Sequence, residues 1–366
     1  MRGVGRRSIP CTALRAALGA ALSAALSAAP LAAQNLTVRV VTALERAPLG
    51  YSVVSLPALG VERFTSASGV VVMPVGAPGA LRLRVKRLGY TPLDTTLTLT
   101  DAAVQEVTVA LARVSYRLDA VRVVSWPTCR RPGITADTDP QLRGIVDQLR
   151  QNAERYRLLT RSYPFVYTVS RQFGHRATDG SVILESGDAI IVSGTPEWTY
   201  RPGSLIGRET ALGTRSVWVM RIPSISDLAE DVFVDNHCFH VAGLEEKEGQ
   251  RLLRLDIVAA QRLKGVDVNA VVWLDPQDYQ LRYASYTLTK APPQVRGLLH
   301  STSHSTYREL IPFVPVLDLT VAENTFQEGR SRTTTKVMVE RQRTERVMFR
   351  GARPEGVSAD SVPPPR

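Results

Sequence analysis

Strict alternation of apolar and basic residues marks one segment in the first third of the chain. In residues 81–86, LRLRVK, every second residue is apolar and the residues between are Arg or Lys. Successive side chains of a β-strand point to opposite faces, so this pattern predicts a strand with one buried and one solvated face. The same period recurs over residues 36–40 and 107–111, with proline and glycine between the runs. Short strands at this spacing predict a small antiparallel β-sandwich over residues 34–125.

A linker and one helix follow the predicted sandwich. Residues 126–140, WPTCRRPGITADTDP, contain prolines and lack a regular apolar period, which is typical of a connecting segment. Asp139 and Pro140 supply a helix N-cap and a first-turn proline. Apolar residues then recur at intervals of three and four, as one face of a helix requires, at Leu142, Val146, Leu149, Ala153 and Tyr156. We expect one amphipathic helix that ends near Leu159.

Residues 141–350 are expected to form an α+β domain in which a curved antiparallel sheet packs on this helix. The chain beyond the helix contains strand-like runs such as FVYTVS, GDAIIVSG, RLLRLDIV and TTTKVMVERQ. Residues 271–288, VVWLDPQDYQLRYASYTL, predict a hairpin that turns between Asp275 and Asp278. The fold class is therefore mainly β, with an antiparallel sandwich followed by this domain.

Three short segments complete the predicted organisation of the second domain. The run DVFV, residues 231–234, is strand-like because it is mostly apolar. The following polar segment GLEEKEGQ, residues 243–250, predicts a loop with a turn at Gly249. Residues 351–366 have little apolar surface to bury and predict a disordered tail.

The N-terminus predicts export. Three arginines precede an alanine-rich apolar stretch over residues 13–29, and Leu31-Ala32-Ala33 offers the small residues that a signal peptidase cleaves after. Cleavage of residues 1–33 removes four arginines and no acidic residue, which lowers the formal charge from +11 to +7. We expect a periplasmic or outer-membrane associated protein. The remaining basic residues form no block, so nucleic acid is not an expected partner.

Residues in the predicted sandwich resemble the carboxypeptidase regulatory-like domain, a transthyretin-like β-sandwich. The segments that carry the resemblance are APLGYSVVSL at 47–56, PGALRLRVKRLGYTPLDTTLTL at 78–99 and LDAVRVV at 118–124. Their Pro-Leu pair, Pro-Gly turn and Gly-Tyr-Thr-Pro stretch occupy the places that such motifs have in the family. The family's aspartate and glycine turn is replaced by SASGVVVM, which keeps only Gly69. The resemblance implies the fold and an exported protein of Gram-negative bacteria, but no single activity.

Two further likenesses concern function. LDAVRVV also looks like the segment that joins such a sandwich to the plug of TonB-dependent receptors, which implies an accessory role in an outer-membrane transport complex. The hairpin at 271–288 resembles the WLDP…LR…Y hairpin of exported regulatory-like-domain proteins of Gram-negative bacteria. It also resembles, more loosely, the sheet of periplasmic lipoprotein carriers. None of these resemblances implies an established activity.

Cys129 and Cys238 are predicted to form a disulfide. They are the two cysteines that remain after cleavage, and paired thiols are the usual state in an oxidising compartment. The bridge would close a loop of roughly 110 residues, which chain-entropy reasoning makes worth about 4–5 kcal/mol. It would fasten the start of the helix to the middle of the sheet.

Two alternatives keep the neighbourhood of Cys238 open for chemistry. A metal site could use His237 and His240 together with His300 and His304, since imidazole nitrogens bind zinc and copper. A hydrolase could use Cys238 as a nucleophile beside His237 or His240. No spacing here matches an established metal or hydrolase motif, and HSTSHSTY at 300–307 alternates like a solvated strand.

Aromatic residues suggest a pocket on the concave side of the sheet, although such side chains also fill cores. The candidate ligand-binding residues are Trp198, Trp218, Trp273, Tyr283 and Tyr286. A pocket lined by a helix and a curved sheet suits acyl chains or peptides. We therefore interpret the chain as an exported, non-enzymatic protein without a cofactor. Its expected partner is an apolar or lipidic ligand or an envelope protein, and the outer-membrane surface is a further candidate.

Overall fold

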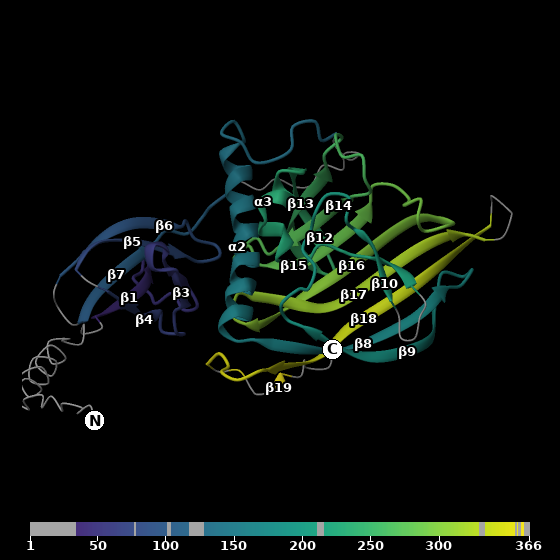
Figure 1. The fold of residues 1–366 in the computed structure, drawn as a ribbon. Helices are drawn as coiled ribbons and strands as arrows, with labels where there is room; N and C mark the ends of the chain where they lie inside the picture. Colours follow the sequence, from purple (N-terminus) through teal and green to yellow (C-terminus); the bar gives the residue numbers. More distant parts are fainter. Residues whose placement is uncertain are drawn as a thin grey trace, which may run out of the picture.

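A computed structural model describes residues 34–76, 78–100, 104–116, 128–210, 216–328, 334–355, 357 and 360–361. It contains a small β-sandwich and a larger domain built on one long sheet, with helix α2 between them (Figure 1). The predicted signal peptide, the LDAVRVV segment and the predicted boundary at residue 125 lie outside the described residues. Among the helices of the described residues, none is long and apolar enough to cross a membrane.

The sandwich consists of a three-stranded sheet in the order β4-β1-β7 and a four-stranded sheet in the order β3-β2-β5-β6. The strands are β1 (Gln34–Thr42), β2 (Val53–Leu56), β3 (Val61–Phe64), β4 (Val70–Val75), β5 (Gly79–Lys86), β6 (Leu93–Leu99) and β7 (Val104–Leu111). A short 3-10 turn, η1 (Pro57–Leu59), joins β2 to β3. The alternating apolar residues of β1 and β5 face each other in one buried core, as their period predicts.

One strand pair departs from the predicted antiparallel sandwich. β7 pairs with β1 in parallel, with Val38 opposite Val107, whereas the other pairs in both sheets are antiparallel. The chain leaves the first sheet after β4, passes through β5 and β6 in the second sheet, and returns as β7 on the free side of β1. That crossover lets β7 run in the same direction as β1.

Helix α2 (Pro140–Ser162) begins where the sequence predicts. The Asp139 carboxylate accepts a hydrogen bond of 2.9 Å from the backbone N–H of Leu142, and Pro140 is the first helical residue. This satisfies one of the N–H groups that a helix start leaves without a partner. The predicted apolar face is buried from Val146 to Tyr156. The helix continues three residues beyond the predicted end at Leu159.

The second domain is built on a ten-stranded sheet in which neighbouring strands are antiparallel. Nine strands follow one another in the order β12-β13-β14-β15-β16-β17-β18-β8-β9, and β19 pairs with β18. The strands are β8 (Phe165–Arg176), β9 (Val182–Ser193), β12 (His237–Lys247), β13 (Gln250–Ala259), β14 (Val268–Leu274), β15 (Leu281–Leu288), β16 (Leu298–Ile311), β17 (Val314–Gln327), β18 (Thr335–Phe349) and β19 (Asp360–Ser361). The fold class is thus the predicted one, mainly β with one main helix.

The predicted hairpin is present, and three local expectations are corrected. β14 and β15 pair on either side of the turn between Asp275 and Asp278. The strand-like DVFV instead forms the short helix α3 (Asp231–Val234). Most of the predicted loop at 243–250 belongs to β12 and β13, with the turn at Glu248 and Gly249. Two residues of the predicted disordered tail pair with β18 as strand β19.

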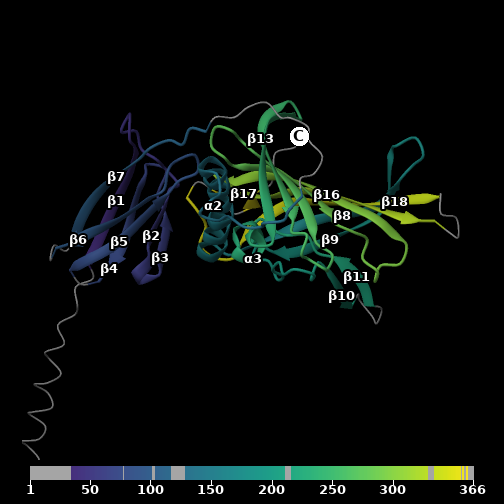
Figure 2. The same cartoon turned by 90° about the horizontal axis from the view of Figure 1, so that it is seen from above.

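The two faces of the long sheet differ. Its inner face, defined here as the face on which α2 packs, forms the main core with α2, α3 and the 3-10 turn η2 (Asp227–Ala229). These helices cover the part of the sheet nearest the sandwich (Figure 2). A separate two-stranded ribbon, β10 (Ile206–Thr210) and β11 (Ser216–Met220), lies over the inner face farther from α2. The inner face therefore has a helix-covered part and a ribbon-covered part.

Candidate ligand-binding cavity

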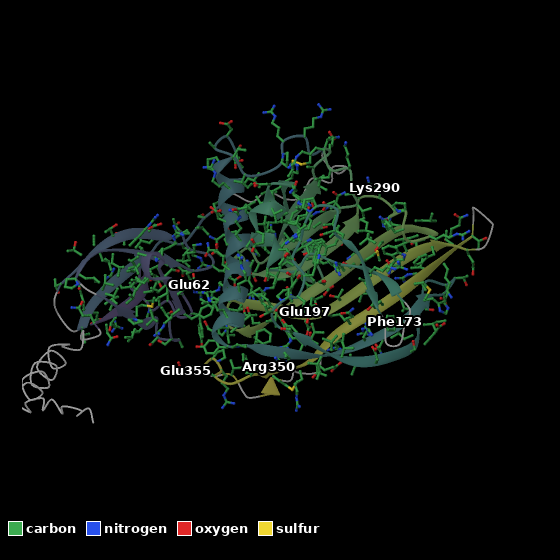
Figure 3. All side chains as sticks on the ribbon, in the orientation of Figure 1. Glu62, Phe173, Glu197, Lys290, Arg350 and Glu355 are labelled. Carbon is green, nitrogen blue, oxygen red and sulfur yellow. A yellow bond between two sulfur atoms is a disulfide. The ribbon has the colours of Figure 1, made fainter. Side chains whose placement is uncertain are left out.

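A cavity of about 580 Å³ lies between the β10–β11 ribbon and the inner face of the long sheet. Its lining comes from β11 on one side and from β8, β15, β16, β17 and β18 on the other. The volume lies within the range of small-molecule sites in proteins. Figure 3 labels Phe173 of β8, one of the lining residues, on the part of the sheet beyond α2.

Apolar side chains form the walls of the cavity. Trp218, Met220 and Ile222 line it from the ribbon side. Phe173, Leu288, Val295 and Phe326 line it from the sheet side. Trp218 is 45% exposed, and the Arg208 guanidinium lies 5.4 Å from the centre of its ring. A large apolar side chain that lines a cavity and stays half exposed is available for contact with a ligand.

Polar side chains of β16 and β17 form the floor. Ser301 and Ser303 point inward with Ser305, since alternate residues of a strand share a face. The Ser305 hydroxyl is 2.9 Å from that of Thr320, so these two satisfy each other. The buried hydroxyl of Ser303 has no hydrogen-bond partner, and the buried Oδ1 of Asn324 has none either. Asn324 lies opposite Ser301, so it is a diagonal neighbour of Ser303 across the strand pair.

The charged groups of the lining are held by neighbouring side chains. Arg171 donates two hydrogen bonds, of 2.9 and 2.6 Å, to the Asp188 carboxylate on β9. This pairing raises the pKa of Arg171 and lowers that of Asp188. Glu340 accepts a hydrogen bond of 2.7 Å from the Gln342 amide. The cavity is therefore apolar at its walls, with the charge of Arg171 compensated by Asp188 and a negative charge left on Glu340.

The structure brings two of the five candidate aromatic residues to this cavity, Trp218 and Tyr286. Trp198 instead packs against the core between the sheet and α2. Trp273 and Tyr283 lie opposite each other on the outer face, where Lys247 Nζ is 4.4 and 5.3 Å from their ring centres. Tyr283 and Tyr286 are three residues apart on β15 and must face opposite ways. The odd spacing of Tyr283 and Tyr286 along the strand was enough, from the sequence alone, to place them on opposite faces.

The floor residues were missed because HSTSHSTY was interpreted as a solvated strand. Its histidines, His300 and His304, are exposed on the outer face, whereas its serines are buried on the inner face. Small hydroxyl residues at every second position of a long strand were the available signal. Their burial depends on which face the helix and the ribbon cover, and the local pattern does not contain that information.

The structure joins Cys129 and Cys238 in a disulfide with a Cα–Cα distance of 5.4 Å. Both residues are buried, and the bridge connects the segment before α2 to the start of β12. A cysteine in a disulfide offers no thiolate, so the hydrolase alternative loses its nucleophile.

The four histidines of the metal alternative are not brought together. His237 is fully buried, with Nδ1 2.7 Å from the Phe233 carbonyl and Nε2 3.2 Å from the Val268 carbonyl. His240 is partly buried beside Asp256, and this burial lowers its pKa. His300 and His304 lie on another strand, β16. Within the described ranges, no group of three or more His, Cys, Asp or Glu residues is placed to hold a metal ion.

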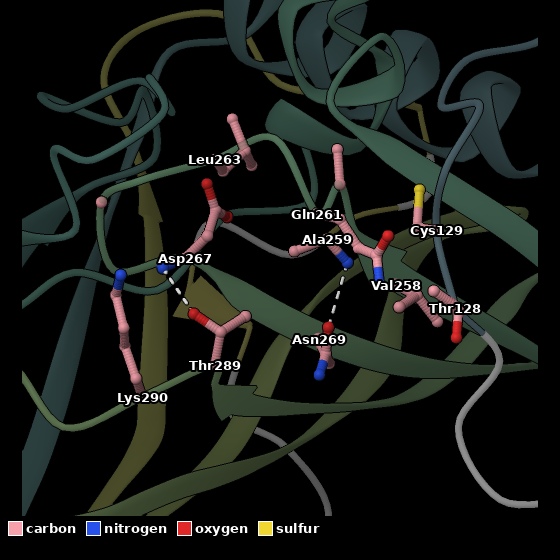
Figure 4. Close-up of a pocket in the computed structure, with 12 residues that line it drawn as sticks. Thr128, Cys129, Val258, Ala259, Gln261, Leu263, Asp267, Asn269, Thr289 and Lys290 are labelled. Carbon is pink, nitrogen blue, oxygen red and sulfur yellow. Dashed lines mark hydrogen bonds between the residues drawn. The ribbon is translucent and has the colours of Figure 1, made fainter.

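A second cavity, of about 350 Å³, lies near the disulfide (Figure 4). Two polar side chains that line it are engaged by backbone groups. Asn269 Oδ1 accepts a 3.0 Å hydrogen bond from the Ala259 N–H, and the Thr289 hydroxyl accepts one of 3.0 Å from the Asp267 N–H. These bonds fix the ends of the strands, so this cavity is the weaker candidate.

No protein family matches this sequence, and no curated protein matches it. Solved structures show only distant similarity. An outer membrane lipoprotein-sorting protein domain from Vibrio parahaemolyticus is similar at 14% identity and TM-score 0.34, over 58% of this chain and 93% of that one. A DUF1329 family protein from Desulfovibrio piger gives 14% identity and TM-score 0.33, over 60% and 96%. A LolA superfamily protein from Nitrosomonas europaea gives 13% and 0.28, over 57% and 94%.

TM-scores at this level carry no argument about this chain. Because no family model matches, the resemblance of residues 34–125 to the carboxypeptidase regulatory-like domain stays a prediction. The function has to be argued from the cavity itself.

Proposed function

We propose that the chain is an exported, non-enzymatic protein that binds an apolar or lipidic ligand between the β10–β11 ribbon and the inner face of the long sheet. The observation that carries the proposal is the cavity of about 580 Å³, whose apolar walls come from two separate sheets. Burial of an acyl chain against these walls would stabilise the complex by removing apolar surface from water. Export rests on the sequence of residues 1–33, and residence in the Gram-negative envelope rests on the resemblance of residues 34–125.

The sandwich is proposed to be an interaction module of the carboxypeptidase regulatory-like type. Its position supports this role, because α2 separates it from the cavity (Figure 1). It could therefore contact an envelope protein while the cavity holds a ligand. The accessory role in a transport complex depends on residues 118–124 and remains a prediction from sequence.

The test replaces a small residue on the floor of the cavity with a larger one. Ala322 on β17 lines the cavity, and Val321 beside it lies opposite the exposed His304 on the outer face. We expect Ala322→Phe to abolish the fluorescence increase of N-phenyl-1-naphthylamine, an apolar probe, on titration with the mature protein. Val321→Phe is the matched control and should leave the titration unchanged. Native mass spectrometry of protein purified from its own periplasm should show a bound small molecule in the wild type and not in Ala322→Phe. A wild type that neither carries a small molecule nor binds the probe would overturn the proposal.

A further inference from the structure

The polar floor of the cavity contains hydrogen-bonding groups that the protein itself leaves unused. Ser303 is 3% exposed, lines the cavity, and its hydroxyl has no partner. Buried polar groups in folded proteins almost always have a hydrogen-bond partner, so each exception calls for an explanation. The neighbouring Ser305 has one, in Thr320, which shows that the strand pair can satisfy its own hydroxyls where the side chains permit.

Asn324 adds a second unused group beside the first. Its Oδ1 is buried without a partner, and it lies across the strand pair from Ser301, diagonal to Ser303. A hydroxyl can donate and accept, and a carboxamide presents both an acceptor and donors. Together they form a small platform that matches a hydroxyl, ester or amide group of a ligand.

The charges of the lining argue against an ionised head group at this platform. Arg171 is bound through both Nε and a terminal nitrogen to Asp188, so its charge is already compensated. The Arg221 guanidinium also lines the cavity, on the ribbon side, where it lies against Gly207 of β10. Glu340 adds a negative charge on the sheet side. The residues of β16 and β17 that line the cavity include no cation. A carboxylate that left water for this floor would therefore lose hydration without gaining an ion pair there.

We propose, on the basis of the function proposed above, that the ligand is an acyl lipid with an uncharged hydroxyl-, ester- or amide-bearing head group. Its head group hydrogen-bonds to Ser303 and Asn324, and its acyl chain lies along the apolar walls toward Trp218. Charged and uncharged amphiphiles can carry the same acyl chain. The site would therefore distinguish them by the charge of the head group.

The test compares two lipids of equal chain length, 1-palmitoylglycerol and palmitate, as competitors for the bound apolar probe. The mature protein should bind 1-palmitoylglycerol at least about tenfold more tightly at pH 7.5, since each hydrogen bond contributes about fivefold. Ser303→Ala and Asn324→Leu should each reduce that preference by about fivefold. Ser303→Thr keeps a hydroxyl and should retain it. His304→Ala, on the outer face of the same strand, is the control for general effects on β16.

The outcomes separate this inference from the proposed function. Equal or tighter binding of palmitate by the wild type would overturn the inference, and so would an unchanged preference in both Ser303→Ala and Asn324→Leu. Either result would leave binding of apolar ligands intact. Failure of the wild type to bind the probe or either lipid would overturn the proposed function itself. Thermal unfolding of each variant shows whether a loss of binding reflects a loss of fold.

Discussion

At the scale of single residues, Arg155 shows how the two parts of the molecule are joined. It lies on α2, is 1% exposed, and donates hydrogen bonds of 2.7 Å to the carbonyls of Phe313 and Tyr51. Tyr51 belongs to the sandwich and Phe313 to the turn between β16 and β17. Burial lowers the pKa of Arg155 because the charged form is poorly solvated there. A guanidinium can reach two separate carbonyls that a single ammonium cannot.

Replacement of Arg155 by lysine should therefore be costly although the charge is kept. We expect Arg155→Lys to lower the free energy of unfolding by about 2 kcal/mol, because one carbonyl loses its donor in a buried site. Arg157→Lys is the matched control, since Arg157 is paired with Glu230 and its side chain is 42% exposed. Its effect should stay within about 0.5 kcal/mol. Urea unfolding followed by circular dichroism measures both, and equal effects would contradict the role assigned to Arg155.

At the scale of elements, α2 shows which features the local sequence determines. Its cap, its first-turn proline and its apolar period all lie within neighbouring residues, and all appear in the structure. The helix α3 was not predicted because its apolar run is too short to show a period. There the Asn236 amide donates a 2.7 Å hydrogen bond to the Val232 carbonyl and satisfies the helix end. That contact becomes evident only when the backbone is already helical.

The N-cap of α2 gives a direct test of this local encoding. Asp139→Ala removes the carboxylate that accepts from Leu142 N–H, so the free energy of unfolding should fall by about 1 kcal/mol. Asp137→Ala lies two residues earlier and serves as control, with little expected change. Thermal unfolding of the two variants side by side decides the matter. A loss of the same size in Asp137→Ala would mean that the cap contributes nothing specific.

The long strands show what local sequence leaves undetermined. Alternation identifies that Ser303 and His304 face opposite ways, but not which face is inside. That choice depends on where α2 and the β10–β11 ribbon pack, and both contacts join segments far apart in the chain. For the same reason, alternation places Tyr283 and Tyr286 on opposite faces, but it does not show which of the two faces the cavity.

At the scale of the whole molecule, the disulfide fastens the segment before α2 to the first strand of the long sheet path. The two cysteines are 109 residues apart, so the bridge removes many conformations from the unfolded chain. The pairing could be predicted from the number of cysteines and the export signal alone. The burial of both sulfur-bearing residues beside Val258 and Ala260 could not, because it depends on the packing of β13.

Loss of the bridge should weaken the whole domain. We expect the double variant Cys129→Ala and Cys238→Ala to lose about 4 kcal/mol of unfolding free energy. The wild type in reducing agent should unfold at the same urea concentration as that variant. Non-reducing mass spectrometry of the mature protein checks the oxidation state. Two free thiols in protein isolated from an oxidising compartment would contradict the assignment.

The unsatisfied hydroxyl of Ser303 has a consequence for the life of the molecule. A buried hydroxyl without a hydrogen-bond partner lowers the free energy of unfolding of the ligand-free protein. A ligand that supplies the hydrogen bond restores that free energy. The ligand-free protein would then unfold more often than the complex. A protease that cleaves unfolded protein would therefore degrade the ligand-free protein first. The rate at which the protein is degraded would fall as the ligand concentration rises, so the abundance of the protein would follow that of its ligand.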